Sequence, residues 1–183
     1  MSRIGKQPVS VPSGVKVTLN GRTITIEGPK GSLSLEHRPE VKVAWDESEK
    51  SISVSVEEKH ADNREAKALW GTTRALINNM ITGVTKGYSR KLEVNGVGWG
   101  GQVQGNQISL NLGFASPVKL DIPAGVTVTA EKQMLTLEGA DKQLVMGFAA
   151  RVRSVKKPEP YNGKGIKYTD EVIKRKQGKQ FGS

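Results

Sequence analysis

Apolar and polar residues alternate in the same way in two stretches of the chain that lie 111 positions apart. The first stretch runs from Val11 to Gly28 and the second from Ile122 to Gly139, and eight of the 18 paired positions are identical. In each stretch two alternating segments flank a short polar turn, which is typical of a β-hairpin. The repeat predicts two hairpins of one design and indicates an internal duplication.

Each half also contains one segment whose apolar residues recur at helical spacing. The first helix is predicted to begin near Asp62, with Glu65 completing a capping box, and to end at Gly83. The second is predicted to begin near Asp141 and to end before Pro158, because proline disfavours helical geometry in the residue that precedes it. Each half of the chain is therefore expected to pair one helix with its strands.

The halves differ in where they place their remaining strands. The first half adds predicted strands after its hairpin, at 32–35, 41–45 and 51–56. The second half adds them before its hairpin, at 90–94, 102–104, 107–112 and 118–122. We predict an α+β protein with two tandem similar domains, each a small, mostly antiparallel β-sheet packed on one α-helix, followed by a basic C-terminal tail. The predicted boundaries are 1–83, 84–157 and 158–183.

Glycines and tryptophans suggest where packing is tight. Gly71 and Gly147 lie in the middle of the two predicted helices, where glycine is unfavourable, and predict close approach of helix to sheet. Trp45 and Trp70 are predicted to fill the core of the first domain. Trp99 is predicted to be packed within the second domain, with stacking on a partner as the alternative.

Three features of the sequence resemble catalytic or ligand-binding motifs, but the residues around them do not fit such a function. Residues 96–103 fit the glycine patterns of nucleotide-binding loops, but alternating segments follow them instead of a helix, and no kinase or P-loop motif accompanies them. His37 and His60 lack partners at catalytic or metal-ligand spacing and are predicted to be exposed. The acidic residues at 46–49 are interpreted as a solvated hairpin tip. A nucleotide-dependent enzyme remains an alternative, whereas neither a cofactor nor a metal site is expected.

Composition and charge limit the remaining possibilities. The 183 residues carry a formal net charge of +10, and residues 151–183 alone contribute +7. The chain has no cysteine, which excludes disulfides and thiolate metal sites. No apolar run reaches the length of a membrane span, and the N-terminal residues lack the apolar segment of a signal peptide, so a cytoplasmic protein is expected.

The basic tail combines three features that suit folded RNA: cations for phosphates, rings for stacking, and glycines for close backbone approach. Pro158 and Pro160 are predicted to keep the tail extended and to lift Tyr161 and Lys164 clear of the domain. A disordered solubilising tail and an anionic membrane surface are the alternatives. The candidate phosphate ligands are Lys156, Lys157, Lys164, Lys167, Lys174, Arg175, Lys176 and Lys179; Tyr161 and Tyr168 are the stacking candidates, and Gly163 and Gly165 the positions of backbone approach.

The segment Pro158-Glu159-Pro160-Tyr161-Asn162-Gly163-Lys164-Gly165-Ile166 closely resembles the signature of the ribosomal protein L6 family. Residues 2–9, 71–76, 94–98 and 112–114 are also similar to that family, in order along the chain. Two departures stand out: Asn162 occupies a position where the family usually has lysine, and Gly100 follows Trp99 where a basic residue is common.

The resemblance implies a duplicated fold whose C-terminal domain and tail bind 23S rRNA. It implies a position near the sarcin–ricin loop and the region where translational GTPases dock, with neighbouring large-subunit proteins as further partners. The implied role is structural rather than catalytic, in the ribosome of the cytoplasm, without a small-molecule substrate.

Overall fold

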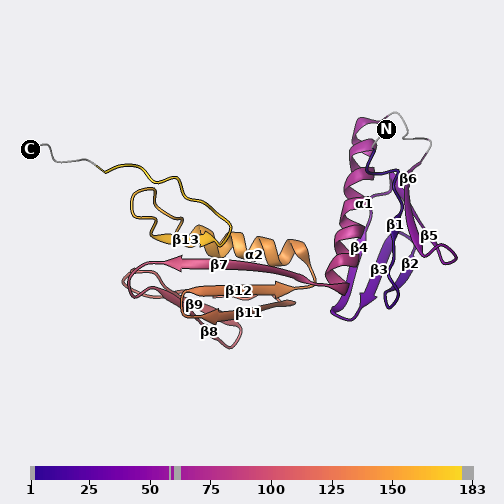
Figure 1. Cartoon of the computed structure of the whole chain (residues 1–183). Helices are drawn as coiled ribbons and strands as arrows, with labels where there is room; N and C mark the ends of the chain where they lie inside the picture. Colours follow the sequence, from indigo (N-terminus) through magenta and orange to yellow (C-terminus); the bar gives the residue numbers. More distant parts are fainter. Residues whose placement is uncertain (1–2, 58, 60–62, 179–183) are drawn as a thin grey trace, which may run out of the picture. The chain divides into compact units, whose positions relative to one another are not determined.

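The computed structural model describes residues 3–57, 59 and 63–178. The chain divides into two compact units, one of residues 1–87 with 140–142 and one of residues 88–139 with 143–183 (Figure 1). Each unit combines antiparallel sheets with one long helix, so the predicted α+β class is confirmed. No helix in the described part of the chain is long and apolar enough to cross a membrane.

The first unit has two small antiparallel sheets and one helix. In chain order its described elements are β1 (Val9–Ser10), β2 (Lys16–Asn20), β3 (Thr23–Gly28), β4 (Gly31–Glu36), β5 (Val41–Asp46), β6 (Ser51–Val56) and α1 (Arg64–Thr85). The strand orders are β2-β3-β4 and β1-β6-β5. Ile24 and Ile26 of β3, Ile52 of β6 and Ile77 of α1 are fully buried in one apolar cluster.

The second unit has the same classes of element in a different order. Its described elements are β7 (Tyr88–Asn95), β8 (Gly100–Gln104), β9 (Gln107–Asn111), β10 (Val118–Asp121), β11 (Val126–Glu131), β12 (Met134–Gly139), α2 (Lys142–Val155) and β13 (Gly165–Tyr168). The strand orders are β11-β12-β7-β13 and β10-β9-β8. Helix α2 contributes Val145, Phe148 and Val152 to the core that the strands share.

The predicted duplication is confirmed, down to the register of the hairpins. Thr18 faces Thr25 in the β2–β3 hairpin, and Thr129 faces Thr136 in the β11–β12 hairpin, at the same offset of 111 positions. A third strand lies against each hairpin in the same place, β4 in the first unit and β7 in the second. β4 follows its hairpin in the chain whereas β7 precedes its own, so one spatial position is filled from two different places in the sequence.

The second unit has an additional edge strand, which comes from the segment interpreted above as a tail. β13 lies beside β7 (Figure 1) and pairs with it antiparallel, with Ile166 opposite Val94. The Ile166 side chain is 0% exposed and belongs to the core. Residues 165–168 are therefore part of the sheet. The apolar–polar alternation of Gly165-Ile166-Lys167-Tyr168 is the local sequence signal for this strand.

Helix α1 ends later than predicted. It continues through Gly83, which is buried, to Thr85, and the Lys86 N–H donates to the Thr82 carbonyl at 2.8 Å. Gly87, with φ of 77°, follows this cap and supplies the left-handed conformation with which helices commonly end. At the other end Asn63 caps α1 by accepting a hydrogen bond from the Glu65 N–H; Asp62 lies outside the described residues.

The predicted surroundings of His37 and Gly147 are wrong. His37 is buried, with only 8% of its surface exposed, and its Nδ1 atom lies 3.1 Å from the Arg38 carbonyl oxygen; His60 lies outside the described residues. A Cβ atom at Gly147 would have nothing within 4 Å, so this glycine does not mark close approach to the sheet. It is exposed on the outer face of α2.

The predicted positions of the tryptophans are confirmed. Trp45 and Trp70 pack against the core of the first unit, and the Trp70 indole N–H donates to the Val54 carbonyl at 2.6 Å. Trp99 packs against the core of the second unit. Asp46 accepts hydrogen bonds from the backbone and hydroxyl of Ser48, which matches the predicted hairpin tip and lowers the pKa of the Asp46 carboxyl.

Candidate nucleic-acid interface

The C-terminal segment, residues 156–178, is folded back onto the second unit rather than extended. The Glu159 N–H donates to the Lys164 carbonyl at 2.9 Å and closes a loop around the Pro160 turn. The Ile166 N–H donates to the Lys156 carbonyl at 2.8 Å, which ties the loop to the end of α2. The Lys176 N–H donates to the Pro160 carbonyl at 2.8 Å, so the last described residues return to the loop.

The two glycines of this loop serve its own packing. Gly165 has φ of 144°, and a Cβ atom there would lie 2.5 Å from the Cα of Pro158. Gly163 has φ of 73°, and a Cβ atom there would lie 3.5 Å from Nη2 of Arg175. Both glycines are buried, whereas Lys164 between them is exposed. The close approach predicted at Gly165 is therefore an approach to the chain itself, whereas at Gly163 the contact is ordinary and the positive φ is what favours glycine.

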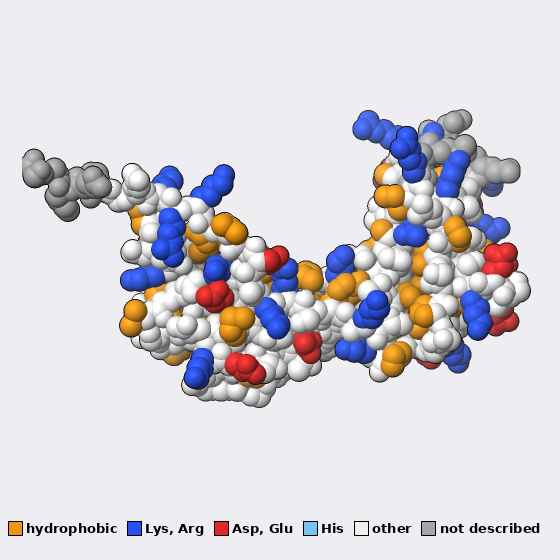
Figure 2. All heavy atoms as spheres, viewed as in Figure 1, with side chains coloured by type: hydrophobic (Ala, Val, Ile, Leu, Met, Phe, Trp, Pro, Cys, Tyr) orange, Lys and Arg blue, Asp and Glu red, His pale blue; other side chains and the backbone are white. Residues whose placement is uncertain are grey.

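Six of the candidate side chains are exposed on this folded segment. The Tyr161 ring, on the turn of the loop, is 54% exposed. Figure 2 shows lysine and arginine side chains gathered over the C-terminal segment of the second unit. The exposed candidates are Lys157, Tyr161, Lys164, Lys174, Arg175 and Lys176, while Lys179 lies outside the described residues.

Lys156 has contacts within the unit instead of facing outward. Its ammonium group donates to the Leu112 carbonyl at 2.7 Å and lies 4.2 Å from the centre of the Trp99 ring and 4.4 Å from that of Phe114. A cation over aromatic faces is stabilised by their negative potential. Lys156 therefore joins the end of α2 to two loops, and a phosphate at this lysine would have to replace three existing contacts.

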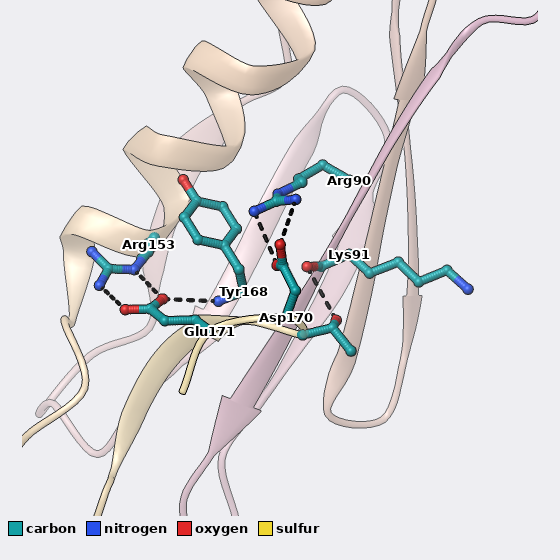
Figure 3. Close-up of polar contacts among 7 residues, drawn as sticks. Arg90, Lys91, Arg153, Tyr168, Asp170 and Glu171 are labelled. Carbon is teal, nitrogen blue, oxygen red and sulfur yellow. Dashed lines mark hydrogen bonds and ion pairs between the residues drawn. The ribbon is translucent and has the colours of Figure 1, made fainter. Parts of the chain in front are cut away.

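Tyr168 is also engaged within the unit. The Arg90 guanidinium lies 4.3 Å and the Arg153 guanidinium 5.6 Å from the centre of its ring (Figure 3). Arg90 is in turn paired with Asp170 at 3.0 Å. A base stacked on this ring would compete with two cations that the protein already places there.

Glu171 fixes the chain that leaves β13. Arg153 of α2 donates from Nε to its carboxylate at 2.8 Å and also from Nη2, and the Tyr168 N–H donates to the same carboxylate (Figure 3). The hydrogen bond from Arg153 is the main cause that lowers the pKa of Glu171, and the same bond raises the pKa of Arg153. Lys167 on β13 pairs with Glu93 of β7 at 3.1 Å. The ion pairs of Arg153 and Lys167 thus hold the segment in place.

Neutralising Glu171 is expected to loosen the segment without unfolding the unit. In Glu171→Gln the stability of residues 165–171 should fall by about 2 kcal/mol, the usual loss for a hydrogen bond to a charged group. Hydrogen exchange of these amides at neutral pH should quicken accordingly, while exchange in β11 and β12 stays unchanged. Equal protection in the variant and the parent would contradict this role of the carboxylate.

The same pair predicts a dependence on pH in the unmodified chain. Because the pKa of Glu171 is lowered by folding, its contribution is complete above the ordinary glutamate value of about 4.3 and is lost as the pH falls through the folded-state value. Protection of residues 165–171 should therefore weaken on acidification below about pH 4.3. Glu171→Gln should lack this step.

Sequence reasoning missed the partners that fix the segment. Arg90 and Arg153 lie on β7 and α2, far along the chain from Asp170 and Glu171, and no local pattern links them. It also gave no role to Asn95 at the end of β7.

Close packing explains Gly96 and Gly101, and a positive φ of 71° explains Gly98. A side chain at Gly96 or Gly113 would collide with the Trp99 ring, and a Cβ atom at Gly101 would lie 2.8 Å from a methyl group of Leu135. The segment connects β7 to β8 and starts no helix, so the geometry that a dinucleotide-binding loop needs is missing. Within the described residues, no cluster of three or more His, Asp or Glu side chains could hold a metal ion.

Comparison with known proteins matches nearly the whole chain. The model of the family "Ribosomal protein L6" matches residues 11–87 and 96–169, one segment in each repeat. A large ribosomal subunit protein uL6 of Carboxydothermus hydrogenoformans is 49% identical over 183 residues, which cover 100% of this chain and 98% of that protein. The uL6 protein of Clostridioides difficile is 47% identical and covers 98% of both chains. The chain belongs to the ribosomal protein L6 family.

Proposed function

We propose that this protein is a structural constituent of the large ribosomal subunit that binds 23S rRNA through its second unit and C-terminal segment. Family membership supports the structural, non-enzymatic role in the ribosome. The names of the relatives support the large subunit as the place of assembly.

The observation that carries the RNA-binding part is the exposed group of cations on an anchored segment. Lys157 and Lys164 lie on the loop that Gly165 closes, and residues 174–176 return to that loop through the backbone bond to Pro160. Phosphates would meet cations whose backbone is already ordered, so less conformational entropy is lost on binding. Each neutralised phosphate also releases counterions, which favours association.

The position within the subunit is the finer part of the proposal. We place the second unit near the sarcin–ricin loop and the docking region of translational GTPases, with other large-subunit proteins as neighbours. The resemblance of residues 158–166 to the family signature supports this placement. Crosslinking of assembled subunits, followed by mapping of the linked nucleotides, tests it directly; links confined to distant rRNA domains would contradict it.

Removing three exposed cations is expected to reduce the salt dependence of RNA binding. With about six phosphates engaged, log affinity should fall with log salt at a slope of roughly −4 to −5. The variant Lys174→Gln/Arg175→Gln/Lys176→Gln should lower the magnitude of this slope by about 2 to 3. Filter binding of a 23S rRNA transcript between about 50 and 300 mM salt measures it.

The matched control removes three exposed lysines of the first unit, Lys16, Lys42 and Lys50. It has the same change in net charge, so its slope should remain within about 1 of the parent value. Equal losses in the two triple variants would mean that overall charge, and not this segment, governs binding.

A further inference from the structure

A pocket opens inside the C-terminal segment, between β13 and the chain that follows it. Its volume is about 320 Å³, at the lower end of the range of about 300–1,000 Å³ found for small-molecule sites. That size suits a single nucleotide and is too small for a helix or a folded domain. Its walls include Asn95, Gly163, Lys167, Thr169, Val172 and Arg175.

The charges around this pocket leave one cation available. Lys167 is paired with Glu93 and Glu171 with Arg153, so these four charges compensate one another. Within the described residues Arg175 takes part in no ion pair, and its guanidinium lies beside Gly163, where a Cβ atom would be 3.5 Å from Nη2. The Arg175 side chain is exposed, and its guanidinium is free to bind a phosphate group or to stack on a flat ring.

The remaining walls have the chemistry of a base-binding site. Asn95 is half-buried at the end of β7, and its side-chain amide, which can both donate and accept, makes no hydrogen bond within the described part of the chain. Val172 is 90% exposed although it is apolar and lines the pocket. A bound phosphate alone would use Arg175 and leave both of these groups without a function.

We propose that this pocket holds one unpaired nucleotide of the bound RNA. The base lies against Val172 with its polar edge on the Asn95 amide, and its phosphate lies at Arg175. This inference rests on the proposed function, because it names a recognition site within the same RNA-binding surface. It predicts that the protein selects RNA with an unpaired nucleotide over a continuous duplex, since a paired base has no free edge to enter the pocket.

Two substitutions in the full chain test the pocket by different means. Asn95→Leu replaces the amide with an apolar group of nearly the same shape, so it removes the hydrogen-bonding edge and should weaken binding to a 23S rRNA transcript by about tenfold. Val172→Ala removes two apolar groups from an exposed wall and should weaken it by about threefold. Neither change alters a charge, so the salt slope should stay at its parent value. Val97→Ala is the matched control, because Val97 is 94% exposed and does not line the pocket.

Chemical probing of unpaired bases in the same complexes identifies the nucleotide. One base should be protected by the parent chain and by Val97→Ala, and should become reactive with Asn95→Leu. Thermal unfolding of Asn95→Leu should match that of the parent. If Asn95→Leu is destabilised, Val172→Ala still tests the pocket, because Val172 is exposed and its truncation should not affect folding.

The outcomes separate the pocket from the wider proposal. If both pocket variants bind as the parent does while the salt slope persists, the pocket holds no nucleotide but the RNA-binding surface stands. If Arg175→Gln lowers the slope by about one while Asn95→Leu leaves affinity and base protection unchanged, the site takes a phosphate alone and the inference is wrong. If the parent chain shows no salt-dependent binding, the proposed function itself fails.

Discussion

Gly165→Ala is expected to detach the C-terminal segment and to weaken RNA binding at least tenfold. The added Cβ atom would lie 2.5 Å from Cα and 2.6 Å from N of Pro158, and both atoms belong to backbone that cannot rotate away. The φ of 144° is also a conformation that alanine rarely adopts. Strain and overpacking together should cost about 2–5 kcal/mol. Since the Ile166 N–H is bonded to Lys156, relief of the clash has to break the register of β13.

Hydrogen exchange of residues 156–176 and RNA affinity should change together in this variant. Gly178→Ala is the control, because a Cβ atom there meets nothing within 4 Å and its φ is not positive. It should leave both measurements unaltered. If Gly165→Ala retains the exchange protection of the parent, the close packing of the loop on Pro158 does not stabilise the segment.

The parts of this fold that could be predicted are those set by local periodicity. Strand alternation around Asn20-Gly21 determined the β2–β3 hairpin, and the 111-residue repeat carried the same register to β11 and β12. Helical spacing located both helices. The end of α1 was placed at Gly83 instead of Thr85, because either Gly83 or Gly87 could end a helix and only packing decides between them.

The environment of the candidate site depended on contacts between distant residues, which periodicity does not report. Lys156 and Lys164 look alike in the sequence, yet Lys156 lies over Trp99 and Phe114 while Lys164 faces solvent. The sequence predicts a Tyr168 ring available for stacking, but the guanidinium of Arg90, 78 residues earlier in the chain, lies against this ring. Residue type identified the basic segment, but its division into anchoring and exposed residues depends on tertiary structure.

Two truncations are expected to separate stability from RNA binding. Removing residues 158–183 takes away β13, the fully buried Ile166 and the partner of Arg153. Loss of a buried aliphatic side chain costs about 2–5 kcal/mol and loss of a charged hydrogen bond about 2. Together these losses approach the total stability of a small domain, about 5–15 kcal/mol. The melting transition of the second unit should fall sharply or disappear, and that of the first unit should remain.

Removing only residues 174–183 should have the opposite effect. The segment keeps β13 and the Arg153–Glu171 pair, so its stability should change by no more than about 1 kcal/mol, the contribution of the backbone bond from Lys176 to Pro160. The salt slope of binding to a 23S rRNA transcript should nevertheless fall by about 3, since this deletion removes four cations. Calorimetry and filter binding on the same two proteins measure both effects.

The contrast between the truncations follows from how inward and outward positions alternate along the segment. Gly163, Gly165 and Ile166 are buried, whereas Lys164 and the cations at 174–176 are exposed, so one stretch of chain both completes a sheet and presents charge. An unchanged melting transition after removal of residues 158–183 would show that β13 is dispensable to the core. In that case the cations would sit on a loose chain, binding would carry the full entropy of ordering it, and the rigid surface inferred here would not exist.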